Sequence, residues 1–81
     1  MVNNNPKLQV TNKFNELFGA GAHEIDVSGE RVKTRGGSYF LAELAVDGQV
    51  IARARERNWR TAYKILRLEV EKLWERGVAL V

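Results

Sequence analysis

Apolar and polar residues alternate through the middle of the chain, between Phe40 and Arg57. An alternation with a period of two predicts β-strands, because successive side chains of a strand point to opposite faces of a sheet. The pair Asp47-Gly48 divides this stretch and is typical of tight turns, so the sequence predicts a β-hairpin. The apolar positions assigned to one face of the hairpin are Phe40, Ala42, Leu44, Val50, Ala52 and Ala54.

The length of this turn decides which face each side chain occupies. A two-residue turn would place Arg53 and Arg55 on the face of Phe40, and burying unpaired charges there would cost several kcal/mol each. We therefore predict a three-residue connection, with Gly48 in the left-handed conformation and a bulge after it. The apolar residues then share one dry face, and the arginines lie on the solvent face, some of them beside Glu43.

The chain beyond this hairpin changes to a helical pattern. Asn58 is a preferred residue type at the N-cap of a helix, and Gly77 is a preferred type just past the end. Apolar residues recur between them at spacings of three and four, which predicts an amphipathic helix with one buried stripe. The residues of this stripe are Ala62, Leu66, Val70 and Leu73.

The opposite stripe of this helix is charged. It is basic at Arg60, Lys64 and Arg67 and acidic at Glu71 and Glu75. This order is the reverse of the one that the helix dipole favours, so dipole stabilisation does not explain it. Basic residues at a helix start indicate an anion-binding surface instead.

The first third of the chain predicts another helix. Residues 1–5 are polar and are expected to be frayed. Asn5 can cap a helix that begins at Pro6, and Thr11 is a rival cap. Gly19 would end this helix, whose apolar side consists of Val10, Phe14, Leu17 and Phe18.

The remaining segments complete the predicted fold. Residues 23–27 alternate and predict a first strand, which continues beyond a bend at Ser28-Gly29, and residues 34–38 form a glycine-containing loop. The predicted fold class is α+β, in the order helix, three antiparallel strands, helix, with both helices packed on one face of the sheet. A single domain covers residues 1–81 and ends in an apolar tail at 77–81.

Size and charge set limits on the function. A chain of 81 residues allows one small domain, whose stability a homodimer would increase. The net charge is +3, from 13 Lys and Arg against 10 Asp and Glu, which is a mild bias towards acidic partners. Cysteine is absent, and no signal peptide or membrane-spanning run is visible, so we expect a cytoplasmic protein without a membrane partner.

No pattern typical of catalysis stands out. His23 is the single histidine, and without partner ligands we expect a surface residue rather than a metal site. The loop TRGGS at residues 34–38 lacks the Lys-Ser/Thr ending of a phosphate-binding P-loop. We therefore expect no enzyme activity and no cofactor.

Several motifs together resemble the double-stranded-RNA-binding domain family over roughly residues 11 to 75. The family has a strand with Phe and apolar residues at every second position before a Gly-containing turn, and this chain has Phe40, Ala42, Leu44, Val46 and then Asp47-Gly48. Small residues follow on the next strand, here Ala52 and Ala54 in place of glycines, and the helix has a polar cap at Asn58. The family's Asn-Glu-Leu of the first helix is matched by Asn15, Glu16 and Leu17.

The sequence departs from the family at two places. Residues 34–38 stand where the family has a Gly-Pro-x-His loop, and Trp59 and Tyr63 stand where it has lysines. These two aromatic residues either extend the core, which we favour, or are exposed and contact a protein partner.

The resemblance implies a module that binds double-stranded RNA. Its contacts would lie on the first helix, the loop between the first two strands and the start of the second helix, touching successive minor grooves and the phosphates between them. The residues at these places are Glu16, Arg31, Lys33, Arg35, Arg60, Lys64 and Arg67.

An alternative is a protein-interaction module, such as a homodimer or a regulator or inhibitor of another protein. The last helix and the residues after it carry more apolar side chains than one buried stripe needs. The predicted interface residues are Leu68, Trp74, Val78 and Leu80.

Overall fold

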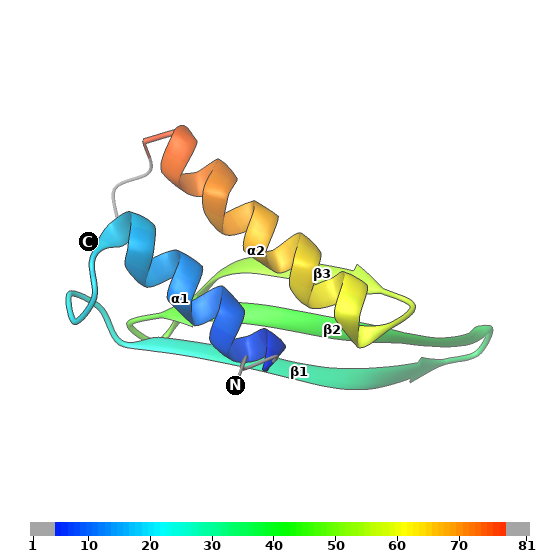
Figure 1. The fold of residues 1–81 in the computed structure, drawn as a ribbon. Coiled ribbons are helices and arrows are strands. Elements are labelled where there is room, and N and C mark those ends of the chain that lie inside the picture. The colour runs from blue at the N-terminus through cyan, green and yellow to red at the C-terminus, as the bar shows by residue number, and fades with distance from the viewer. Residues whose placement is uncertain (1–4, 78–81) are drawn as a thin grey trace.

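A computed structural model describes residues 5–77 of the chain, which form two helices and one sheet (Figure 1). The elements follow in the order α1 (Pro6–Phe18), β1 (Ile25–Thr34), β2 (Gly37–Val46), β3 (Gln49–Glu56) and α2 (Trp59–Glu75). The antiparallel sheet has the order β1-β2-β3, and both helices cover the same face of it. This is the predicted α+β layout.

The two helices run side by side in the same direction, and each begins at its end nearer to the hairpin that joins β1 and β2 (Figure 1). α2 lies over β2 and β3, whereas α1 lies over β1. Farther along the helices, Lys13 Nζ of α1 lies 3.6 Å from Glu71 Oε1 of α2. The opposite face of the sheet is uncovered within residues 5–77.

Asn5, not Thr11, caps α1. The Asn5 side chain accepts hydrogen bonds from the backbone N–H groups of Lys7 at 3.0 Å and Leu8 at 3.4 Å, and Pro6 occupies the first helical position. Thr11 lies inside the helix, where its hydroxyl donates to the Lys7 carbonyl. Of the residues predicted to be frayed, 1–4 lie outside the described part of the chain.

Asn58 caps α2 as predicted. Its Oδ1 accepts a hydrogen bond from the backbone N–H of Thr61 at 2.8 Å. Gly77, just past the end of the helix, has the positive φ of 69° that favours glycine. Both helix ends therefore follow from the local sequence.

The turn between β2 and β3 differs from the predicted one. Val46 pairs directly with Gln49, so the turn has two residues, and Asp47 (φ 52°) and Gly48 (φ 85°) both take the positive φ that a type I′ turn requires. The predicted three-residue connection is therefore wrong.

A bulge farther along β3 restores the register. Ala45 pairs with Val50 and Leu44 pairs with Ala52, which leaves Ile51 as the extra residue. Downstream of the bulge the alternation is as predicted, with Arg53 on the open face. Val50 was placed on the wrong face: it is 40% exposed beside Ala45, and Ile51 packs against the core instead.

The core lies between the sheet and the helices. Its fully or nearly buried residues come from all of these elements except β1: Val10, Phe14, Ala42, Leu44, Val46, Ala54, Ala62, Tyr63, Leu66 and Val70. Ile25 and Val27 of β1 are half-buried and pack against this cluster. Apart from Leu73 of α2, which is half-buried and lies outside this cluster, the apolar residues predicted for both helices and for β2 therefore face the core.

Gly29 of β1 leaves room for an aromatic pair under α2. Phe40 and Tyr63 meet edge to face with ring centroids 5.5 Å apart. A Cβ on Gly29 would clash with Tyr63 Oη and would lie 2.7 Å from Phe40 Cζ. β1 runs through this position without a break, so the glycine is needed for close packing rather than for the predicted bend.

Asp47 ties the α1–β1 connection to the β2–β3 turn. Its Oδ2 lies 2.8 Å from His23 Nδ1, and its Oδ1 accepts from the Glu24 backbone N–H at 2.9 Å. The hydrogen bonds from His23 and then Glu24 hold the pKa of Asp47 below its usual value. His23 is half-buried against Asp47 and Phe14, so the prediction of a simple surface residue is wrong.

Candidate nucleic-acid interface

Positive and negative side chains gather at opposite ends of the molecule. The β1–β2 hairpin and the first half of α2 carry basic residues: Arg31, Lys33, Arg35, Arg57, Arg60, Lys64 and Arg67. The start of β1, the β2–β3 turn and the second half of α2 carry acidic residues: Glu24, Asp26, Asp47, Glu69, Glu71 and Glu75. Glu30 and Glu56 near the basic end and Lys72 and Arg76 at the acidic end reduce this separation of charge but do not reverse it.

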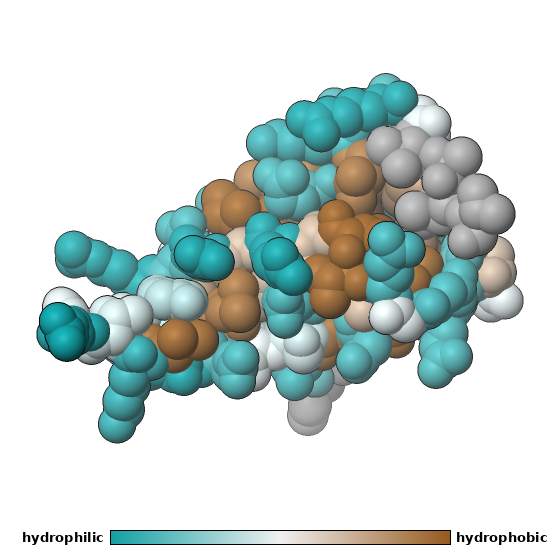
Figure 2. Space-filling view, turned by 180° about the vertical axis from the view of Figure 1, so that it is seen from behind, coloured by the Kyte–Doolittle hydropathy of each residue, from teal (hydrophilic) through white to brown (hydrophobic). Residues whose placement is uncertain are grey.

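The hairpin end extends beyond the helices as a polar arm. Figure 2 shows hydrophilic atoms at this end of the molecule and hydrophobic atoms gathered nearer its middle. Lys33 and Arg35 are exposed on the arm, and neither forms an ion pair with any residue of the described range. Both cations are therefore available to an anionic partner.

Arg31 of β1 is more constrained than the other basic residues of the hairpin. Its Nη1 donates to Ser38 Oγ at 3.2 Å, and its Nη2 donates to the Arg57 carbonyl at 3.3 Å. The guanidinium carbon also lies 6.0 Å from the centre of the Phe40 ring. These contacts hold Arg31 on the helix-covered side of the sheet without neutralising its charge.

Three cations form a row on α2. Arg60, Lys64 and Arg67 are spaced about one turn apart, so they lie along one side of the helix. Arg60 and Lys64 are exposed and Arg67 is half-buried. Within residues 5–77 none of the three pairs with a carboxylate. The structure thus brings these predicted site residues together.

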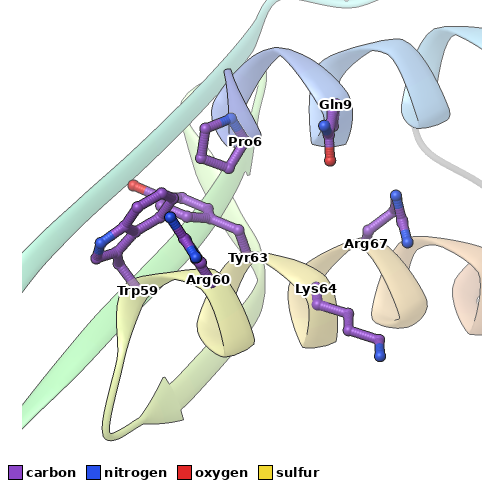
Figure 3. A pocket seen from close by; sticks show the side chains of 7 residues that line it. All are labelled: Pro6, Gln9, Trp59, Arg60, Tyr63, Lys64 and Arg67. Atoms are coloured by element: carbon purple, nitrogen blue, oxygen red, sulfur yellow. The ribbon is translucent and has the colours of Figure 1, made fainter. Parts of the chain in front are cut away.

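A groove of about 390 Å³ separates this row from the start of α1 (Figure 3). Pro6 and Gln9 of α1 line one side. The α2 side is lined by Trp59, Arg60, Tyr63, Lys64 and Arg67. In Figure 3, Arg67 points towards α1, and Lys64 points away from the gap between the helices. The groove therefore combines an aromatic wall with cations.

The two aromatic residues of the groove have different surroundings. Tyr63 is only 6% exposed, as predicted for a core residue, and burial raises the pKa of its hydroxyl. Trp59 is 41% exposed, so its predicted place in the core is wrong. The Arg60 guanidinium carbon lies 5.1 Å from the centre of the Trp59 ring. A large apolar ring is therefore presented at the surface next to positive charge.

Glu16 lies apart from these basic residues. It is exposed on α1, about two turns beyond Gln9, and its carboxylate lies 3.3 Å from Lys13 Nζ. Lys13 also reaches Glu71 of α2. The structure therefore does not join Glu16 to the cluster formed by the other predicted contacts.

Arg53 and Arg55 of β3 contact other side chains on the open face of the sheet. Arg53 Nε lies 2.7 Å from Glu43 Oε2, as the predicted neighbourhood of Glu43 implies. The Arg55 guanidinium carbon lies 5.5 Å from the centre of the Tyr39 ring. The alternation of arginine along this strand thus creates a surface separate from the α2 groove.

The predicted protein interface is only partly described. Leu68 is 38% and Trp74 is 50% exposed, whereas Val78 and Leu80 lie outside the described residues. Leu68 and Trp74 are six positions apart on α2, which turns their side chains about 120° away from each other around the helix. They do not form one continuous patch by themselves.

A metal site and a membrane-spanning helix were also sought among residues 5–77. No three residues among His, Asp and Glu come together there in a group that could hold a metal ion. No helix in this range is both long and apolar enough to cross a membrane.

No known protein-family model matches the chain, and no curated protein sequence matches it significantly.

Proposed function

We propose that the protein is a small module that binds double-stranded RNA through phosphate and minor-groove contacts. The observation that carries this proposal is the set of basic side chains without acidic partners on the hairpin and on α2: Lys33, Arg35, Arg60, Lys64 and Arg67. Lysine and arginine at a phosphate backbone release bound counterions, which is the main source of nonspecific nucleic-acid affinity.

Two further features support the proposal. The sequence resemblance assigns RNA contacts to the first helix, the loop between the first strands and the start of the second helix. Arg31, fixed by Ser38 and the Arg57 carbonyl, supplies one more charge between the hairpin tip and α2. Glu16 lies apart from this cluster and pairs with Lys13, so it carries none of this support; in the proposed complex it would accept a hydrogen bond from a ribose 2′-hydroxyl, a group that distinguishes RNA from DNA.

Fluorescence anisotropy with a labelled RNA duplex tests this function. A duplex of about 20 base pairs is long enough for a domain of this kind, which spans about 16 base pairs. We expect two RNA duplexes of unrelated sequence to bind equally well and a DNA duplex to bind more weakly, because shape and 2′-hydroxyl contacts carry the recognition. Absence of RNA binding at low salt would refute the proposal.

A protein-interaction module is the second candidate, and the exposure of Trp74 favours it. Half of this large side chain is in contact with solvent near the end of α2. Exposed tryptophans are enriched among the residues that dominate protein interfaces. A homodimer through Trp74 would explain its exposure, and sedimentation of the free protein distinguishes this arrangement from a monomer.

A further inference from the structure

The groove between α1 and α2 has features that phosphate binding does not require. A row of exposed cations alone is sufficient to contact a duplex backbone. Here the row borders a hollow of about 390 Å³, which lies within the range of small-molecule sites. An indole ring that is 41% exposed lines this hollow. The groove is therefore suited to a flat ligand that carries negative charge.

Trp59 lies at the surface because of its place in the fold. It is the first residue of α2, directly after Asn58, whose side chain caps the helix. Tyr63, one turn later, is held in the core against Phe40 and forms the inner part of the groove. The backbone beneath Trp59 is thus fixed on both sides, which lowers the entropy lost when a ligand stacks on the ring.

The charges of the groove match a nucleotide. The Arg60 guanidinium lies over the indole ring, and Arg67 points from α2 towards α1 (Figure 3). Neither arginine pairs with a carboxylate in the described part of the chain. Unpaired bases stack on aromatic side chains and on arginine planes, and their phosphates bind cations. A peptide phosphorylated on serine or threonine would use the cations but would leave the indole face without a stacking partner.

We propose that this groove binds one unpaired nucleotide next to the RNA duplex, with its base stacked on Trp59, its own phosphate at Arg60 and the adjacent phosphate of the strand at Arg67. This inference rests on the proposed function, since the duplex contacts of Lys64 and of the hairpin hold the RNA end near the groove. The protein then distinguishes duplexes with an overhang or an adjoining loop from blunt duplexes. Arg60 moves from the indole ring to the phosphate when the base enters.

Two RNAs that differ only in a short single-stranded extension test this site. We expect the wild-type protein to bind the duplex with the overhang about fivefold or more tightly than the blunt duplex, because stacking of one base on an aromatic ring contributes an effect of that size. Trp59→Ala should remove this preference, so that the two duplexes bind with equal affinity. Trp59→Phe should retain part of the preference.

A second measurement observes the ring itself. Trp74→Phe leaves Trp59 as the only tryptophan in the chain, because the sequence contains two. Stacking with a short single-stranded oligouridylate should quench its fluorescence, and the quenching should weaken in a further Arg67→Ala variant. Circular dichroism melting of each variant verifies that the fold is retained.

The outcomes separate this inference from the proposed function. Equal affinity for the blunt and extended duplexes, without quenching by the oligonucleotide, would overturn the nucleotide site but leave duplex binding in place. Quenching without any duplex binding would uphold the nucleotide site and overturn the duplex module. Absence of both would overturn both proposals, and quenching by a phosphorylated peptide but not by RNA would assign the groove to a protein partner.

Discussion

Replacement of Gly29 by alanine tests the packing of the sheet against α2. The added Cβ would clash with Tyr63 Oη and would lie 2.7 and 2.8 Å from Phe40 Cζ and Cε1. Carbon atoms in favourable contact are about 3.5–4.0 Å apart, so the two rings must move by roughly 1 Å. The Tyr63 ring is buried and the Phe40 ring is half-buried against it, which limits this movement.

We expect Gly29→Ala to reduce the free energy of unfolding by about 1–3 kcal/mol, the usual cost of overpacking a core. In a domain of this size, each kcal/mol lowers the melting temperature by about 4–8 °C. Gly36→Ala is a matched control, because a Cβ there meets no atom within 4 Å and the backbone does not require a positive φ. Its melting temperature should equal that of the wild type.

A double variant identifies the atoms responsible. Tyr63→Phe removes the hydroxyl oxygen that the new Cβ would meet first, so it should recover part of the stability lost in Gly29→Ala. The remaining loss reports the contact with Phe40. An unchanged melting temperature of Gly29→Ala would refute the close packing of β1, β2 and α2 at this point.

Three other predictions concern the core, the acid response and self-association. Ala54→Leu should lower stability by about 1–3 kcal/mol in chemical denaturation, because Ala54 is only 4% exposed beneath α2, and an unchanged midpoint would contradict its place in the core. The pKa of Asp47 is lowered from 3.8 by His23 and Glu24, so its carboxylate stabilises the fold above that value and loses this effect as the pH falls through its lower folded pKa. The melting temperature of Asp47→Asn should therefore lie below that of the wild type at neutral pH and approach it in acid, and a constant difference across this range would disprove the linkage. If Trp74 mediates a homodimer, Trp74→Glu should shift sedimentation of the concentrated protein from dimer to monomer; a wild type that already sediments as one chain would exclude the dimer.

The local sequence was sufficient to predict the order of the elements and most of the core. Caps at Asn5 and Asn58 and the change from a period of two to a period of 3.6 define the elements. The position of the β3 bulge was not predictable in this way. A three-residue connection and a two-residue turn followed by a bulge at Ile51 give the same alternation from Ala52 onward. Only the residues before Ala52, above all Val50 and Ile51, distinguish the two arrangements.

The candidate site was predicted only in part. The spacing of Arg60, Lys64 and Arg67 in the sequence places them on one side of a helix. The groove, however, depends on the approach of Pro6 and Gln9, which are distant in sequence. The prediction that Trp59 extends the core treats it as a continuation of the apolar side of the second helix, and it is exposed instead. Its position at the first residue of the helix, directly after the cap, was the available signal that it lies at the edge.

The dependence of duplex RNA binding on salt tests the central proposal most directly. Each phosphate contact contributes a slope of about 0.9 to the fall of log affinity with log salt for a B-form duplex, and we expect a similar dependence here. The double variant Arg60→Ala/Lys64→Ala should lower the slope by at most roughly two units at every duplex sequence. The control Lys72→Ala/Arg76→Ala removes the same charge at the acidic end of α2 and should leave the slope close to that of the wild type. Equal slopes for the two double variants, or a wild-type protein that binds no duplex RNA at low salt, would contradict the account.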